Sequence, residues 1–120
     1  ICLLESTFDQ AHYPKLHDFL FCGEELTHKT AAALNKRFPD AHIFNTYGPT
    51  ESTVAITEIE ITNDILNHYE RLPIGYLKPG MNAQVVNENG AQVTDGQKGE
   101  LVIYGQNVSK GYINNPEKNA

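Results

Sequence analysis

The stretch from Asn45 to Glu51, which reads Asn-Thr-Tyr-Gly-Pro-Thr-Glu, concentrates the side chains of this chain that could do chemistry. Tyr47 offers an aromatic ring that could stack on a base, and Glu51 offers a carboxylate of the kind that binds Mg²⁺. The hydroxyls of Thr46 and Thr50 could contact phosphate oxygens. These residue types together indicate a nucleotide site. An ordinary turn between two strands that happens to carry a tyrosine is the alternative.

The elements around this stretch would place it at the end of a strand. Residues 41–44 form a short apolar run with the length of a buried strand. Gly48-Pro49 turns the backbone sharply, and the β-branched residues that follow predict an extended strand over 53–61. Ligands bind at the carboxyl ends of strands in open α/β sheets, so this position favours binding.

The preceding residues predict a strand, a helix and a second strand. Residues 19–22 form a compact apolar run that ends at Gly23. Thr27 is a good N-cap for a helix over 28–38, which has apolar residues at helical spacing and positive charge in its last turn. Short links between these elements predict a βαβ unit with parallel strands.

The second half of the chain reads as antiparallel β-structure. Residues 63–69 predict one or two helical turns with Asn63 as cap, and residues 72–80 are punctuated by Pro and Gly like a linker. Asn89-Gly90 is a strong hairpin turn, here between strands at 83–87 and 91–93.

A further strand is predicted over 100–104, with Leu101 and Ile103 on one face. The expected fold is therefore α/β: a βαβ portion of a larger sheet over residues 1–74, which carries the nucleotide-binding motif, and a small antiparallel β subdomain over residues 75–120.

Composition and charge limit the classes of function that the chain could have. The chain has 120 residues, of which 40% are hydrophobic and 20% charged, as in a soluble globular protein. Its net charge of −6 argues against nucleic acid as a partner. No apolar run approaches the roughly 20 residues that cross a bilayer, so we expect no membrane insertion. Two cysteines are too few for a disulfide framework, and we expect a cytoplasmic protein.

Several catalytic motifs are absent from the sequence. It has no G-x-x-x-x-G-K-[ST] phosphate loop, no G-x-G-x-x-G fingerprint, no H-E-x-x-H and no G-x-S-x-G elbow. The five histidines show no metal-binding spacing. Metal hydrolase, serine hydrolase and dehydrogenase interpretations are therefore unsupported.

Three segments carry a resemblance to a known family. Residues 45–51 resemble the N-x-Y-G-P-T-E core motif of adenylate-forming enzymes. Residues 99–112, GELVIYGQNVSKGY, resemble a second core motif of that superfamily, G-E-L-x-I-x-G-x-x-V-x-x-G-Y. Residues 21–26, FCGEEL, precede the first motif at the family's spacing. The chain is thus identified as an internal piece of the large N-terminal domain of an adenylate-forming enzyme.

Within this superfamily the chain most resembles the ligases that activate D-alanine for a D-alanyl carrier protein in teichoic acid modification. The resemblance implies that a carboxylate is joined to ATP with Mg²⁺, and that the acyl group then passes to the phosphopantetheine thiol of the carrier. An adenylation domain of a nonribosomal peptide synthetase for another small amino acid is the nearest alternative. A non-catalytic nucleotide-binding module is another.

The resemblance also implies residue roles. Tyr47 would stack on adenine, with the backbone of Gly23, Glu24 and Glu25 beside it. The expected nucleotide-binding residues are Gly23, Glu24, Glu25, Asn45, Thr46, Tyr47, Gly48, Pro49 and Thr50.

The expected catalytic residues are Thr50, which would bond the α-phosphate, and Glu51, which would ligate Mg²⁺. Cys22 and Val54 would line the pocket for the amino acid, although a purely structural role for Cys22 is equally open. The family's phosphate loop, its ribose-binding aspartate and its catalytic lysine have no counterpart in this sequence. We therefore expect residues 1–120 alone not to catalyse adenylation.

Overall fold

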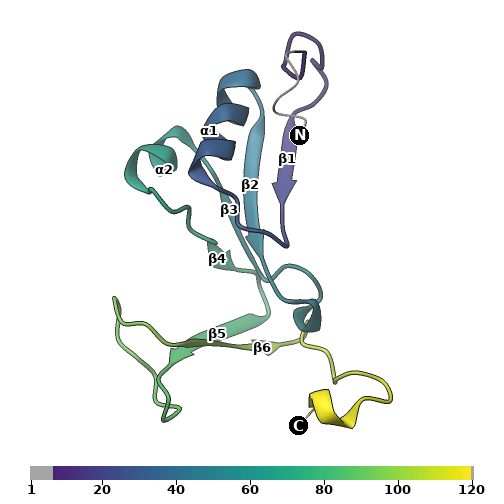
Figure 1. Cartoon of the computed structure of the whole chain (residues 1–120), viewed down its shortest axis with the longest axis vertical. Helices are drawn as coiled ribbons and strands as arrows, with labels where there is room; N and C mark the ends of the chain where they lie inside the picture. Colours follow the sequence, from purple (N-terminus) through teal and green to yellow (C-terminus); the bar gives the residue numbers. More distant parts are fainter. Residues whose placement is uncertain (1–6, 120) are drawn as a thin grey trace.

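The computed structural model describes residues 7–119 and contains two separate sheets (Figure 1). The elements in chain order are β1 (Asp18–Phe21), α1 (His28–Arg37), β2 (His42–Tyr47), the 3₁₀ helix η2 (Thr50–Ser52), β3 (Thr57–Glu60), α2 (Asn63–His68), β4 (Tyr76–Leu77), β5 (Met81–Val86), β6 (Glu100–Gly105) and the 3₁₀ helix η3 (Pro116–Asn119).

The predicted βαβ unit is confirmed. β1 and β2 are parallel neighbours, from Asp18 opposite His42 to Phe21 opposite Asn45. The helix between them starts where the sequence indicates, because the side chain of Thr27 accepts a hydrogen bond from the Thr30 backbone N–H at 3.2 Å. This cap satisfies one of the free amides at the helix start.

The four-stranded sheet has the order β1-β2-β3-β4, with β3 antiparallel to both β2 and β4. The predicted strand over 53–61 is wrong for its first part, because β3 covers only Thr57–Glu60. Thr53 and Val54 have φ values of 59° and 73°, in the left-handed region that β-branched residues rarely adopt. The chain therefore forms a tight loop there before the strand begins.

The main core lies between this sheet and the two helices, which run beside each other along one side of it (Figure 1). Phe38 is fully buried, and its ring lies 4.9 Å from that of Phe19 and 5.0 Å from that of Phe8. The other buried members of this core are Leu26, Ala31, Leu34, Ile43, Ile61 and Leu72.

The N-cap of the second helix differs from the predicted one, Asn63. α2 covers Asn63–His68, but its N-cap is Thr62, whose side chain accepts from the Ile65 N–H at 3.3 Å. Asn63 instead accepts a 2.6 Å side-chain hydrogen bond from Asn35 of α1. Its side chain thus joins the two helices.

The second sheet is a two-stranded antiparallel ribbon of β5 and β6. The Asn89-Gly90 turn forms, with Gly90 at φ 75°, but the predicted strand over 91–93 is wrong. In place of that strand, residues 91–93 form a single β-bridge, between Gln92 and Val86. The strand does not form, because β6 pairs with the whole length of β5 instead.

The two sheets do not merge into one compact body. The radius of gyration is 17.5 Å, against about 14 Å for a compact domain of this length. Figure 1 shows the ribbon below the four-stranded sheet. We propose that the second unit starts near residue 75, after which the chain adds only the two-residue β4 to the first sheet before it enters the ribbon.

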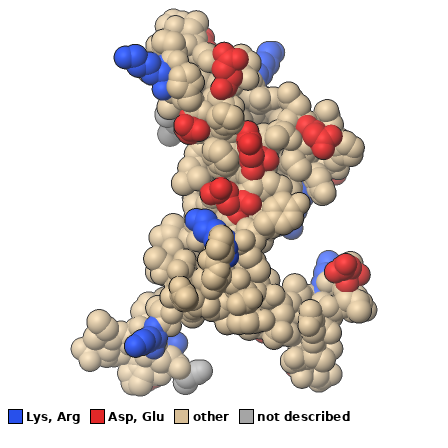
Figure 2. Space-filling model, turned by 180° about the vertical axis from the view of Figure 1, so that it is seen from behind, with Lys and Arg blue, Asp and Glu red and all other residues tan. Residues whose placement is uncertain are grey.

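The predicted α/β fold class is confirmed by this architecture. On the face shown in Figure 2, acidic side chains lie mainly over the upper part, which holds the four-stranded sheet. Among residues 7–119, no helix is both long and apolar enough to cross a bilayer.

Candidate functional site

An open cavity of about 530 Å³ lies where β1 and β2 end. Its lining joins the segment after β1, the end of β2 with the turn that follows, and the segment before β4. The lining residues are Gly23, Glu24, Glu25, Leu26, Asn45, Thr46, Tyr47, Gly48, Pro49, Thr50, Arg71, Leu72 and Ile74. All nine residues expected to bind the nucleotide are among them, so the fold brings the 21–26 and 45–51 segments together.

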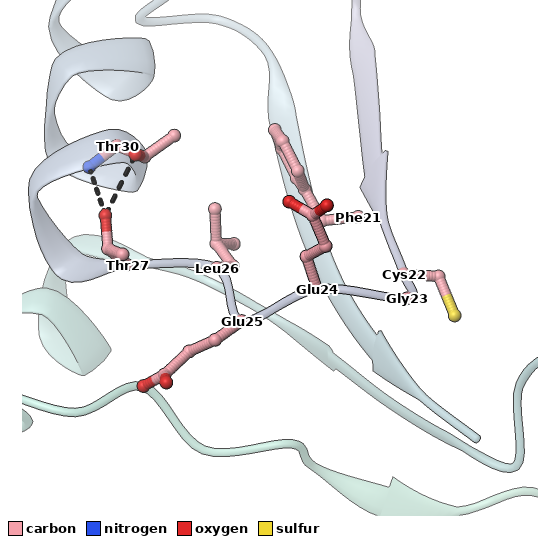
Figure 3. A pocket seen from close by; sticks show the side chains of 8 residues that line it. All are labelled: Phe21, Cys22, Gly23, Glu24, Glu25, Leu26, Thr27 and Thr30. Atoms are coloured by element: carbon pink, nitrogen blue, oxygen red, sulfur yellow. Dashed lines mark hydrogen bonds between the residues drawn. The ribbon is translucent and has the colours of Figure 1, made fainter. Parts of the chain in front are cut away.

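A second hollow of about 510 Å³ lies beside the first and shares its 23–26 wall (Figure 3). The segment crosses from the end of β1 to α1, with the Cys22 side chain directed away from Glu25. Thr27 and Thr30 close the far end, joined by the hydrogen bonds of the helix cap. The 23–26 segment thus has an open surface on two sides.

The last residues of β2 are fixed by buried side-chain hydrogen bonds. The Asn45 amide donates to the Pro73 carbonyl at 2.8 Å, and the Thr46 hydroxyl donates to the Phe21 carbonyl at 2.8 Å. Both residues are at most 5% exposed. Their side chains therefore hold the cavity walls together, while Tyr47 is 38% exposed.

Gly48 lets the following loop fold back on the strand. A Cβ at this position would lie 2.7 Å from the Val54 carbonyl oxygen, closer than such contacts occur. The Ile56 N–H donates to the Tyr47 carbonyl at 2.7 Å and closes the loop. Only glycine permits this approach without a shift of the loop.

Cys22 and Val54, the two residues expected to contact the amino acid, lie against each other. The Cys22 thiol donates to the Val54 carbonyl at 3.3 Å. Neither residue lines the 530 Å³ cavity, and Val54 is 64% exposed. Backbone strain of the kind seen at Thr53 and Val54 costs about 1–3 kcal/mol per residue and is concentrated at functional sites.

Glu51 stands outside the cavity, one residue beyond Thr50. The hydroxyl of Tyr112 donates a short hydrogen bond to the Glu51 carboxylate. This bond lowers the pKa of Glu51, and it raises the pKa of Tyr112, because it favours the ionised carboxylate and the protonated phenol. Glu51 is therefore held as an anion beside the nucleotide-site candidates.

The second motif contacts the 51–53 loop through this hydrogen bond and two others. The Ser109 N–H donates to the Glu51 carbonyl at 2.6 Å, and the Thr53 hydroxyl donates to the Asn107 carbonyl at 2.8 Å. No motif or periodicity in the sequence indicates that residues 107–112 contact the 51–53 loop.

Four further lining residues were missed: Leu26, Arg71, Leu72 and Ile74. The last two lie in the stretch 72–80 that was interpreted as a linker. Leu72 and Ile74 supply apolar surface in the same cavity as Tyr47. Arg71 donates two hydrogen bonds to the Glu25 carboxylate, at 2.9 and 3.4 Å, and so bridges opposite walls. The alternating apolar residues around Pro73 were the available signal.

The described residues contain no cluster of three or more His, Cys, Asp or Glu side chains that could hold a metal ion. Mg²⁺ in nucleotide sites is commonly held by one or two carboxylates together with substrate phosphates and water. The single ionised carboxylate of Glu51 fits that manner of binding.

Comparison with known proteins agrees with these features. Residues 2–113 match the AMP-binding enzyme family. The D-alanine–D-alanyl carrier protein ligase of Lactiplantibacillus plantarum is 63% identical over all 120 residues, which make up 24% of that protein. The chain therefore spans about a quarter of the length of this curated relative.

Solved structures show the same fold. PA1221, an NRPS protein containing adenylation and PCP domains, superimposes with a TM-score of 0.83 at 27% identity, over 93% of this chain and 23% of that one. The Vibrio cholerae adenylation domain AlmE, in complex with glycyl-adenosine-5'-phosphate, gives a TM-score of 0.75 at 30% identity, over 88% of this chain and 20% of that one.

The resemblance to adenylate-forming enzymes, and to D-alanine–D-alanyl carrier protein ligases among them, is thereby confirmed. This chain belongs to the AMP-binding enzyme family.

Proposed function

We propose that this chain is part of an ATP-dependent ligase that adenylates D-alanine and passes it to the phosphopantetheine thiol of a D-alanyl carrier protein. The observation that carries the proposal is the cavity at the ends of β1 and β2, lined by all nine residues expected to bind the nucleotide. The 63% identity to a ligase of that name supports the choice of substrate.

The adenine ring would stack on Tyr47, whose ring is partly exposed at the cavity. Leu72 and Ile74 supply apolar surface in the same cavity, where the base would lie. The walls from Gly23 to Glu25 would contribute backbone groups. Stacking of this kind contributes about 1–3 kcal/mol per base.

The reacting groups would lie at the Thr50 end of the cavity. The carboxylate oxygen of the amino acid attacks the α-phosphorus of ATP, so that the acyl-adenylate forms and pyrophosphate leaves. Thr50 would donate a hydrogen bond to the α-phosphate and orient it for this attack. Glu51 would hold Mg²⁺, which when bound neutralises negative charge on the phosphates.

The amino-acid pocket would lie beside Cys22 and Val54, which hold each other in place through the thiol hydrogen bond. The similarity to AlmE, which was solved in complex with glycyl-adenosine-5'-phosphate, supports a small amino acid. The thiol of the carrier's pantetheine would then attack the acyl carbon and release AMP. The natural setting would be the cytoplasm, in teichoic acid modification.

Catalysis would need the full-length protein. The chain spans about a quarter of its curated relative, and the family's phosphate loop, ribose-binding aspartate and catalytic lysine have no counterpart in residues 1–120. We expect the isolated chain to be inactive in adenylation.

The test is amino-acid-dependent exchange of pyrophosphate into ATP by the full-length protein that carries these residues. We expect D-alanine to support the fastest exchange, with L-alanine and glycine well behind. Residues 1–120, run in parallel, should give none.

Fastest exchange with another small amino acid would favour a peptide-synthetase adenylation domain, the alternative that similarity to PA1221 supports. Absence of exchange from a well-folded full-length protein would contradict the proposal and favour a non-catalytic nucleotide-binding module.

A further inference from the structure

The Tyr112–Glu51 hydrogen bond joins the first motif to a residue 61 positions later in the chain. The Tyr112 hydroxyl donates this hydrogen bond to Oε1 of the carboxylate. An ionised carboxylate has about four acceptor positions, and this hydroxyl uses one of them. The same carboxylate can therefore accept from Tyr112 and bind a cation at once.

Tyr112 is itself held from several sides. Its backbone N–H donates to Asn119 Oδ1 at 2.7 Å, and Asn119 Nδ2 donates back to the Tyr112 carbonyl at 2.9 Å. The Lys118 ammonium lies 5.5 Å from the centre of the Tyr112 ring, within range of a cation–π contact. η3 thus fixes the backbone and approaches the ring of this tyrosine.

The neighbouring residue is adapted to the same arrangement. Gly111 has φ 116°, and a Cβ there would lie 2.7 Å from Asn119 Oδ1. A side chain at this position would displace the amide that holds Tyr112. The Ser109 N–H bond to the Glu51 carbonyl, at 2.6 Å, docks the segment before Gly111 on the loop.

Glu51 needs such support because of where it stands. It lies on a three-residue 3₁₀ turn and is exposed, so its side chain has several rotamers open to it. A hydrogen bond from a fixed donor selects one of them. Charge-assisted bonds are roughly twice as strong as neutral ones, so Tyr112 is well suited to this task.

We propose that Tyr112 is the positioning residue that orients the Glu51 carboxylate toward the nucleotide-bound cation. This inference rests on the proposed function, because it takes Glu51 as the cation ligand. It adds a residue of the second motif to a site otherwise built from the first sheet.

The test compares Tyr112→Phe with Tyr104→Phe in the full-length protein. Tyr104 lies on β6, is 46% exposed and pairs with Asn82 in the ribbon, so its substitution makes the same chemical change away from Glu51. Binding of Mn²⁺ is measured by electron paramagnetic resonance with α,β-methylene-ATP present. Affinity for the analogue alone is measured without metal.

We expect Tyr112→Phe to weaken Mn²⁺ binding about three- to tenfold, the lower end reflecting the exposure of the pair. Affinity for the analogue alone should stay unchanged, and Tyr104→Phe should alter neither value. In a Glu51→Gln background, Tyr112→Phe should cause no further loss, because the carboxylate that Tyr112 orients is no longer there to bind the cation.

Mn²⁺ affinity in Tyr112→Phe equal to that in Tyr104→Phe would overturn the inference and leave the proposed function standing. An equal loss in the Glu51→Gln background would also overturn it. If the unsubstituted protein bound no Mn²⁺ with the analogue, both would fall. Should Tyr112→Phe not fold, Asn119→Ala decides: weaker Mn²⁺ binding supports the inference, and unchanged binding overturns it.

Discussion

The four-stranded sheet and the two-stranded ribbon are stabilised in different ways. The first sheet is covered by α1 and α2 over a core that holds seven buried residues in the described range 7–119. The ribbon has no helix packed on it among the described residues, and only Met81 and Val86 of its strands are buried. A two-stranded antiparallel pair is only marginally stable alone in water.

This difference separates two contributions to the candidate site. The first sheet builds the cavity, since every lining residue belongs to it or its connections. The ribbon supplies no wall, but the segment after β6 docks on the loop that carries Glu51. The packed first sheet thus fixes the shape of the cavity. The segment after β6 contacts one charged group beside it, the Glu51 carboxylate, through Tyr112.

Truncation of a core residue should destabilise the first sheet much more than truncation of a ribbon residue destabilises the ribbon. Phe38→Ala should lower the free energy of unfolding of the first sheet by about 3–5 kcal/mol, because a fully buried ring leaves a cavity. Leu101→Ala, on β6 and 36% exposed, should cost less than about 1 kcal/mol. Amide hydrogen exchange of the full-length protein measures the loss of unfolding free energy in each variant. Equal losses in the two variants would contradict the proposed difference in stability between the first sheet and the ribbon.

Gly48→Ala should damage the loop that the first sheet presents. The added Cβ would meet the Val54 carbonyl oxygen, and such overpacking costs about 1–3 kcal/mol. Displacement of the loop should reduce pyrophosphate exchange about a hundredfold.

Gly90→Ala is the control for this change. Gly90 has positive φ, but an added Cβ meets nothing within 4 Å. We expect exchange to stay at the unsubstituted level there. A tolerated Gly48→Ala would show that the close approach is unimportant.

Tyr47→Ala should weaken ATP binding about tenfold, because the loss of one stacking ring costs about 1–3 kcal/mol. Tyr47→Phe keeps the ring and should bind nearly as well. Tyr76→Ala removes the ring of a β4 residue that is 79% exposed and does not line the cavity. Calorimetric titration with α,β-methylene-ATP distinguishes the three; a similar loss in Tyr76→Ala would argue against stacking at Tyr47.

The smallest expected effect is a pH dependence of the stability of the first sheet. The Glu60 carboxylate bonds the His42 ring at 2.7 Å and raises the pKa of His42 above its usual 6.5. The pair therefore contributes stability that is complete below pH 6.5 and is lost as the pH rises through the raised value.

Melting temperatures of the full-length protein across this range should fall slightly less with pH in His42→Gln and in Glu60→Gln than in the unsubstituted protein. Both side chains are about half exposed, so the difference should be small. An unchanged pH dependence in both variants would show that the pair does not stabilise the sheet.

Local patterns were sufficient to predict the parts of the fold that depend on near neighbours. Thr27 caps α1 as expected, since the signal lies within one helical turn. The parallel pairing of β1 and β2 followed from the short connections. The nine residues expected to bind the nucleotide line one cavity because their segments lie at the ends of these two strands.

Other features depended on contacts that no local pattern encodes. Thr53 and Val54 read as strand residues, but the return of the chain onto Gly48 forces them into the left-handed region. The Asn89-Gly90 turn was evident from its two residues. The pairing of β5 with β6 instead depends on contacts along the full length of both strands. The Tyr112–Glu51 bond spans 61 residues and leaves no periodic signal.

The most direct test of the central claim is a crystal structure of the full-length protein with a non-hydrolysable D-alanyl-adenylate analogue. We predict that the base lies in the cavity against Tyr47, with the alanyl group beside Cys22 and Val54. A base bound elsewhere, such as along β5 and β6, would contradict the assignment of the nucleotide site to the first sheet.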